Sequence, residues 1–130
     1  MLRLSFLILA LLPACQQDQT VSGFAAPGQT WVLQELDGAP FAARATLVFP
    51  EAGKIAGQAP CNRYSGTQKA PYPWFETGPI VATEMACPDL DKEVRFFQAL
   101  ENMSLVEVSG NTLILSNDKG DQMVFAADPG

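Results

Sequence analysis

Apolar and polar residues alternate in short runs over most of the chain, and this pattern predicts a series of short strands. The run 31–36 alternates as a half-buried strand does. Similar runs follow at 45–49, 54–58, 62–69, 105–108, 112–115 and 122–126, and another short strand is expected within 75–83. Glycine-containing turns at 51–53 and 117–120 separate neighbouring runs. The pattern therefore predicts about seven or eight short strands.

One segment has a helical period instead. Its apolar residues recur at intervals typical of one helix face, at Leu90, Val94, Phe97 and Leu100. A Cys-Pro-Asp segment precedes it and suits a helix start, because proline is tolerated at the first helical position. We expect this face to pack under the strands. The predicted fold class is α+β, with an antiparallel sheet of about seven or eight short strands curled barrel-like around one α-helix.

The N-terminus has the pattern of a targeting segment. After Arg3, residues 4–12 are nearly all apolar, a run too short for a bilayer core, which needs about 20 helical residues. It suits the apolar part of a signal peptide. The run ends in Leu-Pro-Ala-Cys at 12–15, which resembles the lipobox of bacterial lipoproteins. The resemblance implies a signal peptide at 1–14 and a diacylglycerol, with an acyl chain on the freed amine, at Cys15.

The residues after Cys15 bear on location and domain limits. Gln16 stands where many inner-membrane lipoproteins have Asp, so the outer membrane, with the protein facing the periplasm, is the expected location. Residues 16–29 are polar and broken by glycine and proline, which predicts a flexible tether between the lipid-bearing Cys15 and a domain at 30–127. We expect a monomer whose first partner is the membrane.

The chain has three cysteines. With Cys15 assigned to the lipid, Cys61 and Cys87 remain as a pair, and two thiols in a small exported domain usually form a disulfide. Three alternatives stay open at this stage: a two-cysteine metal site, a redox-active pair and two free buried thiols.

Composition excludes several functions. The chain has no histidine, so a mechanism that needs Ser-His-Asp or Cys-His is excluded. Its net charge is −6, and no basic run suggests nucleic-acid binding. Paired acids occur at Asp89 with Asp91 and at Glu93 with Glu101, and they are interpreted as solvated helix faces. We therefore expect no catalytic residue, no metal and no cofactor.

Several motifs together resemble one family. The chain is similar to the META domain, or HslJ-like, family over roughly 30–126, through the segments Trp31 to Gly38, Gly57, Cys61 to Gly66, Thr83 to Cys87, Glu93, Phe96, Phe97 and Leu100. The resemblance implies strands wrapped around a helix. It also implies a small envelope lipoprotein or stand-alone domain linked to heat shock, antibiotic tolerance and secretion or virulence, with no established enzymatic activity.

Two groups of residues are candidate sites. Asn62 and Arg63 follow the first cysteine of the pair, and Thr83 and Glu84 precede the second, so a disulfide would gather them into a polar recognition patch. The favoured alternative is structural: Asn62 caps a turn and Arg63 pairs with Glu84 or Glu93.

The second candidate is Trp74, which lies with Tyr72 and Phe75 in a proline-rich stretch. Exposed aromatic residues would form a contact patch, whereas buried ones would close the barrel. For Phe75 the buried reading is favoured.

Together these observations predict a non-catalytic envelope lipoprotein that acts as an interaction or chaperone-like module, with an envelope protein as a partner, in stress or antibiotic tolerance or in envelope assembly. The alternative is a carrier of a small apolar ligand, with a cavity inside the curled sheet. A core packed with side chains would argue against the carrier.

Overall fold

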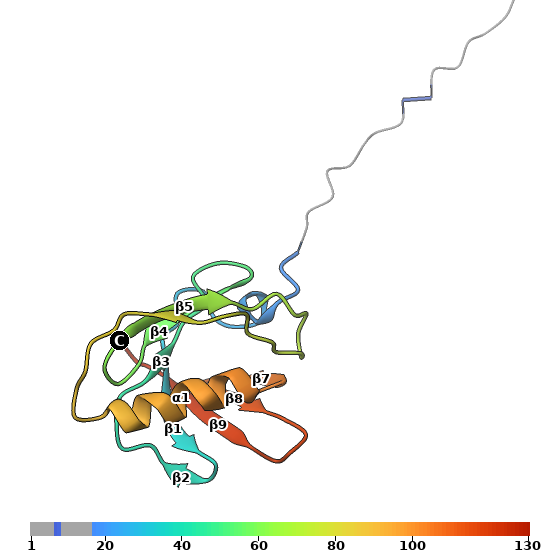
Figure 1. The fold of residues 1–130 in the computed structure, drawn as a ribbon. Helices are drawn as coiled ribbons and strands as arrows, with labels where there is room; N and C mark the ends of the chain where they lie inside the picture. Colours follow the sequence, from blue (N-terminus) through green and yellow to red (C-terminus); the bar gives the residue numbers. More distant parts are fainter. Residues whose placement is uncertain (1–6, 9–16) are drawn as a thin grey trace, which may run out of the picture.

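The computed structural model describes residues 7–8 and 17–130 (Figure 1). The expectations for a signal peptide and for the lipid on Cys15 fall largely outside these residues. The described elements, in chain order, are η1 (Val21–Gly23), β1 (Trp31–Leu36), β2 (Ala39–Pro40), β3 (Thr46–Leu47), β4 (Lys54–Gln58), β5 (Arg63–Thr67), β6 (Val81–Ala82), α1 (Leu90–Asn102), β7 (Leu105–Ser109), β8 (Thr112–Ser116) and β9 (Gln122–Ala127).

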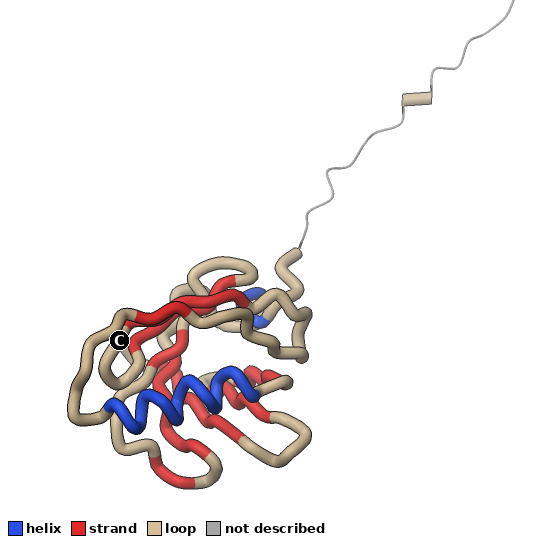
Figure 2. Tube along the Cα trace, viewed as in Figure 1, coloured by secondary structure: helices blue, strands red, loops and turns tan. Residues whose placement is uncertain are grey.

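The strands form two antiparallel sheets. The larger has six strands, in the order β2-β1-β9-β8-β7 with β3 also paired to β1, and the smaller has the order β4-β5-β6. Neighbours in sequence pair as hairpins in β4–β5, β7–β8 and β8–β9, because short turns favour antiparallel neighbours. Figure 2 shows helix α1 lying against these strands. The α+β class is confirmed.

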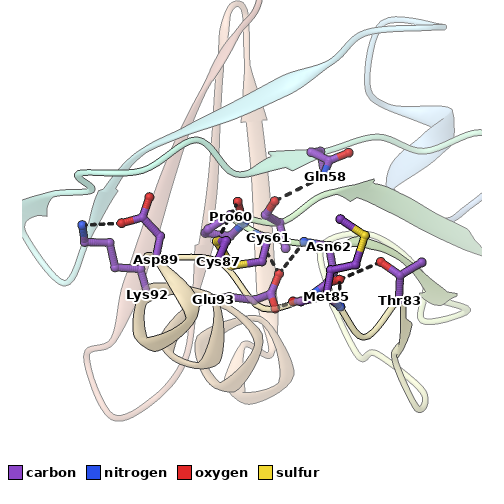
Figure 3. Close-up of a disulfide and its surroundings, with 11 residues drawn as sticks. Gln58, Pro60, Cys61, Asn62, Thr83, Met85, Cys87, Asp89, Lys92 and Glu93 are labelled. Carbon is purple, nitrogen blue, oxygen red and sulfur yellow. Dashed lines mark hydrogen bonds and ion pairs between the residues drawn. A yellow bond between two sulfur atoms is a disulfide. The ribbon is translucent and has the colours of Figure 1, made fainter.

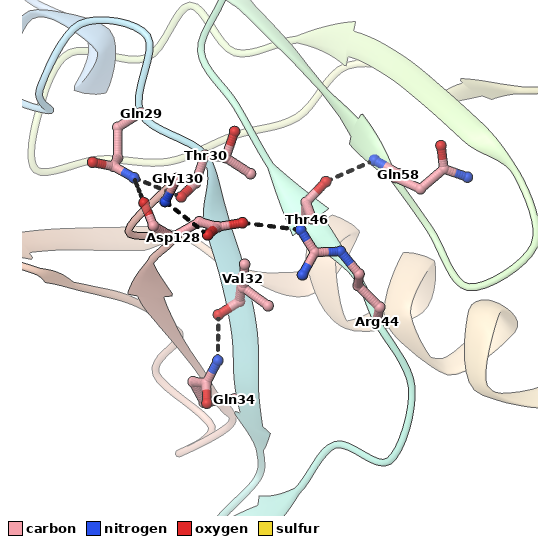
Figure 4. Close-up of polar contacts among 9 residues, drawn as sticks. All are labelled: Gln29, Thr30, Val32, Gln34, Arg44, Thr46, Gln58, Asp128 and Gly130. Atoms are coloured by element: carbon pink, nitrogen blue, oxygen red, sulfur yellow. Dashed lines mark hydrogen bonds and ion pairs between the residues drawn. The ribbon is translucent and has the colours of Figure 1, made fainter.

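The junction between the sheets bears on the predicted barrel-like curl. The sheets meet through a bridge between Val48 and Ala56 and through the side chain of Thr46, whose Oγ1 accepts a hydrogen bond of 2.9 Å from the amide of Gln58 (Figure 4). The strands β4 to β6 otherwise pair only with one another. The two sheets are therefore not closed into a barrel, and nine strands are present in the described part of the chain, rather than seven or eight.

The buried face of helix α1 differs from the predicted one. Glu93, Phe96 and Leu100 are at most 4% exposed, whereas Leu90 and Val94 are 41% and 49% exposed. The prediction that Leu90 and Val94 belong to the core face is therefore wrong. The helix is turned so that a glutamate enters the interior, which is possible because loop groups donate hydrogen bonds to its carboxylate.

The core is filled by side chains from both sheets and the helix. The largest fully buried side chains include Trp31 of β1, Phe125 of β9, Phe96 of α1 and Phe75 of the loop before β6. They belong to one continuous hydrophobic cluster, which leaves the carrier alternative without support from the core. No helix within residues 7–8 and 17–130 is long and apolar enough to cross a bilayer.

Residues 19–25 do not behave as the expected tether. Val21 is 1% exposed and belongs to the core cluster, and the carbonyl of Gln19 accepts a 2.7 Å hydrogen bond from the amide of Tyr72. The ring of Phe24 stacks on that of Tyr72, with centroids 4.2 Å apart. The folded unit therefore begins near Gln19, earlier than the predicted boundary at residue 30, because Val21 provides an apolar side chain that the core takes up.

Tyr64 of β5 makes stability depend on alkaline pH. Its hydroxyl donates a 2.6 Å hydrogen bond to the carbonyl of Thr46, and burial raises the pKa of its phenol above the usual value of about 10. Above that pH the unfolded chain loses the phenolic proton while the folded chain keeps it, so the unfolded state is favoured. We expect the free energy of unfolding to fall as pH rises beyond about 10.

The variant Tyr64→Phe tests this prediction. It is expected to be less stable by about 1 kcal/mol at neutral pH, because the hydrogen bond to Thr46 is lost. It should also show a shallower alkaline fall in stability. Urea unfolding at neutral pH and above pH 10 measures both quantities, and equal alkaline slopes in the two proteins would contradict the assignment to Tyr64.

Candidate functional site

The two segments that carry Cys61 and Cys87 meet at one edge of the molecule. Cys61 follows β4, Cys87 precedes α1, and the two form a disulfide with their Cα atoms 5.5 Å apart (Figure 3). The predicted disulfide is thus present. It fastens the segment 82–87 to the turn between β4 and β5, at the N-terminal end of α1.

Glu93 holds the turn from the side of the helix. Its Oε1 accepts hydrogen bonds from the backbone amides of Cys61 and Asn62 at 3.0 and 2.8 Å, and its Oε2 accepts one from the side-chain amide of Asn62 at 2.7 Å (Figure 3). The side chain is 4% exposed. The interpretation of Glu93 as part of a solvated helix face is therefore wrong, since both of its oxygens act as acceptors inside the fold.

Asn62 connects Glu93 to the segment before the second cysteine. Its Nδ2 also donates to the carbonyl of Met85 at 2.9 Å, and its Oδ1 accepts from the hydroxyl of Thr83 at 2.8 Å and from the amide of Met85 at 2.7 Å. These bonds use both amide protons and both lone pairs of the side chain. Asn62 therefore positions the backbone of 83–85 and has no free side-chain polar group to offer a ligand, and Glu93 uses both of its oxygens to hold the turn.

The other predicted site residues separate into different places. Arg63 is exposed, and no ion pair joins it to Glu84 or Glu93, although all three lie in the described part of the chain. The predicted pairing of Arg63 with a carboxylate is therefore wrong. Glu84 is exposed beside Thr83. Trp74 is 58% exposed and forms a bridge with Leu105, which follows the opposite end of α1.

A surface groove lies over the network of Asn62 and Glu93, and we call it the disulfide-edge groove. Its volume is about 420 Å³, and it is lined by Asn62, Ala82, Thr83, Glu84, Met85, Ala86, Leu90, Glu93 and Phe97. Met85 on one wall is 66% exposed, and Leu90 on the other is 41% exposed. The groove thus has apolar walls on a backbone that the disulfide and the hydrogen bonds fix.

The helix carries a second apolar stripe next to the buried one. Leu90, Val94 and Phe97 are spaced as neighbours on one helix face. Leu90 and Phe97 line the groove, and Val94 extends this apolar face beyond it. The helical period predicts all three as core residues, and of the three only Phe97 packs against the core. Met85 was missed, because a single methionine in a loop gives no periodic signal.

The covalent link can be tested directly. Mass spectrometry of the mature protein, digested without reduction, is expected to show the peptides of Cys61 and Cys87 joined. Recovery of both residues as alkylatable thiols from protein purified without reductant would contradict the pairing. Among the described residues, no group of three or more cysteine and acidic side chains is placed to hold a metal ion.

Comparison with solved structures supports the fold. A protein from Burkholderia xenovorans, whose structure was determined by NMR, matches with a TM-score of 0.64 and 23% identity, over 80% of this chain and 84% of that one. A DUF4847 family protein from Bacteroides vulgatus, known from a crystal structure, matches with a TM-score of 0.68 and 17% identity, over 85% of this chain and 99% of that one.

Comparison with curated proteins gave no significant match. Comparison with protein families matched the META domain over residues 22–130, which is most of the chain and includes the disulfide, the network around Glu93 and helix α1. This chain therefore belongs to the META domain family.

Proposed function

We propose that this protein is a lipid-anchored, non-catalytic module of the cell envelope, which binds an apolar segment of another envelope protein in the disulfide-edge groove. The observation that carries the proposal is that the exposed apolar side chains of Met85 and Leu90 line the same groove, and that the exposed Val94 continues the helix face of Leu90. Contiguous exposed apolar patches on soluble domains are typical of interaction sites.

The chemistry of the site supports binding over catalysis. The polar side-chain atoms of Glu93 and Asn62 form hydrogen bonds that hold the loop in place. The exposed polar residues at the rim of the groove are Thr83 and Glu84. Such a rim around an apolar centre is typical of a protein contact surface. A role in stress or antibiotic tolerance, or in envelope assembly, is part of the proposal and follows from the family resemblance.

The anchor is a separate part of the proposal and has its own test. Mass spectrometry of the mature N-terminal peptide is expected to find Cys15 as the first residue, carrying acyl chains. Metabolic labelling with a palmitate analogue should give a signal in the wild type and none in Cys15→Ser. An unmodified Cys15 in protein from the envelope would contradict the anchor. It would not bear on the disulfide-edge groove, which has its own test.

The groove is tested by pull-down from crosslinked membranes with the lipidated protein. The variant Val94→Asp places a charge on the exposed stripe and, because Val94 lies at the surface, is expected to change stability by no more than about 0.5 kcal/mol. Recovery of the partner should be lost in this variant.

The matched control is Trp74→Ala, which removes an exposed apolar side chain at the other end of the helix and should retain the partner. Equal recovery by wild type and Val94→Asp would contradict the proposal. A lipid that co-purifies in place of a protein would favour the carrier alternative.

A further inference from the structure

The N-terminal segment enters the fold at a defined place. Gln19 accepts the amide hydrogen bond of Tyr72, and Phe24 stacks on the Tyr72 ring. Tyr72 belongs to the loop before Trp74, and Trp74 bridges to Leu105 at the start of β7. Figure 1 shows the chain reaching the domain on this side, away from the end where the segment 83–89 leads into α1. We call Phe24, Tyr72 and Trp74 the entry face.

The length of chain before Gln19 restricts how the domain can sit. Four peptide units separate Cys15 from Gln19, and consecutive Cα atoms are about 3.8 Å apart, so these residues span at most about 15 Å. This is close to the radius of gyration of about 13 Å that is expected for a domain of this size. If Cys15 carries the lipid, as proposed above, the entry face cannot move a domain's width away from the bilayer.

The entry face has the side chains that suit a lipid surface. Phe24 is 53% exposed and stacks on the Tyr72 ring. Trp74 is 58% exposed and lies two residues after Tyr72 in the same loop. Aromatic side chains favour the interface between water and the bilayer, where the ring is partly buried among the head groups. We propose that the entry face rests on the membrane that holds the Cys15 anchor, with Phe24 and Trp74 inserted at head-group depth.

Charge decides which lipid surface this contact fits. Trp74 also lines a groove of about 600 Å³ whose rim carries Glu76 and Glu101, and both acids are exposed. These carboxylates disfavour anionic head groups, so the contact depends on burial of aromatic rings and fits a zwitterionic surface. The arrangement directs the disulfide-edge groove, at the opposite end of α1, away from the lipid.

The two tryptophans provide a direct test. Trp31 is 1% exposed in the core, so a change of surroundings at the surface affects the emission of Trp74 alone. The lipidated protein is reconstituted into phosphatidylcholine vesicles, with and without brominated acyl chains that quench nearby indoles. We expect a blue shift of the emission on reconstitution and loss of most of the Trp74 contribution in brominated vesicles.

Two variants make the result specific. Trp74→Phe, which leaves only Trp31, should show no quenching. Leu90→Trp in the Trp74→Phe background places the reporter at the opposite end of α1, and it should also remain unquenched. Equal quenching of the two reporter positions would overturn the orientation.

Flotation of the vesicles separates this inference from the anchor. Protein that floats with the vesicles while Trp74 stays unquenched would overturn the membrane contact and leave the anchor intact. A blue shift that appears only when envelope protein is added would overturn it in favour of a protein partner at the Trp74 groove. Protein that fails to float would contradict the anchor and, with it, the constraint on which the inference rests.

Discussion

Replacing Glu93 by alanine is expected to lower the free energy of unfolding by at least about 3 kcal/mol. The carboxylate accepts three hydrogen bonds inside the fold, from the backbone amides of Cys61 and Asn62 and from the Asn62 side chain. Its removal leaves these donors without acceptors where Asn62 and Glu93 are each only 4% exposed, and each buried unsatisfied group costs about 1–3 kcal/mol. Urea unfolding with the disulfide intact measures the loss.

Glu101→Ala is the matched control, because Glu101 lies on the same helix and is exposed. Its effect should stay within about 0.5 kcal/mol. Glu93→Gln keeps one carbonyl oxygen but turns an amide toward groups that donate, so an intermediate loss is expected. A loss below about 1 kcal/mol in Glu93→Ala would show that water or a rearranged loop satisfies the donors, and the structural role given to Glu93 would be wrong.

The second large effect is expected at Gly57 in β4. A Cβ atom there would overlap the carbonyl oxygen of Thr46 and lie 2.8 Å from the hydroxyl of Tyr64. The same carbonyl accepts the Tyr64 hydrogen bond, so the substitution disturbs packing and the bond together. Gly57→Ala should destabilise the domain by about 2–4 kcal/mol, as overpacking costs about 1–3 kcal/mol and the lost bond about 1 kcal/mol.

Gly66 on the neighbouring strand provides the comparison. A Cβ atom there would meet its nearest atoms, in Pro79 and Ile55, at 3.5 and 3.6 Å, which are ordinary contacts. Gly66→Ala is therefore expected to change stability by less than about 1 kcal/mol in either direction. If thermal or urea unfolding shows similar effects for the two alanine variants, close packing at Gly57 is not the reason for glycine there.

The elements of the fold could be predicted from local pattern. The helix begins at Leu90, two residues after the proline that was expected at its first position, and ends one residue before Met103. Its existence and approximate limits could be predicted because its period and its first-turn acids are local signals. The hairpins of β7 to β9 follow from alternation and glycine turns. The arrangement of the strands into two sheets could not be predicted, since it depends on pairing between residues that are distant in sequence.

The candidate site shows the same limit at the level of side chains. The pattern of apolar residues along the helix predicts that Glu93 faces solvent. Glu93 is buried instead, because the backbone amides of residues 61 and 62, about thirty positions earlier in the chain, donate hydrogen bonds to its carboxylate. The same apolar pattern predicts that Leu90 and Val94 lie in the core. The helix orientation that buries Glu93 places both of them at the surface. Asn62 and Thr83 were found by their positions beside the cysteines, and the disulfide does bring them together.

The burial of Val21 affects how the protein tolerates shortening. Its side chain occupies a place in the core that no residue after position 30 supplies, and Ala25 packs into the same cluster. A protein that starts at Thr30 would contain all the β-strands and the α-helix but would expose apolar surface and a vacated space, which favours aggregation. The segment that follows Cys15 is thus also part of the folded domain. If Cys15 carries the proposed lipid, proteolysis between residues 19 and 30 would release the protein from the membrane and weaken its fold in a single step.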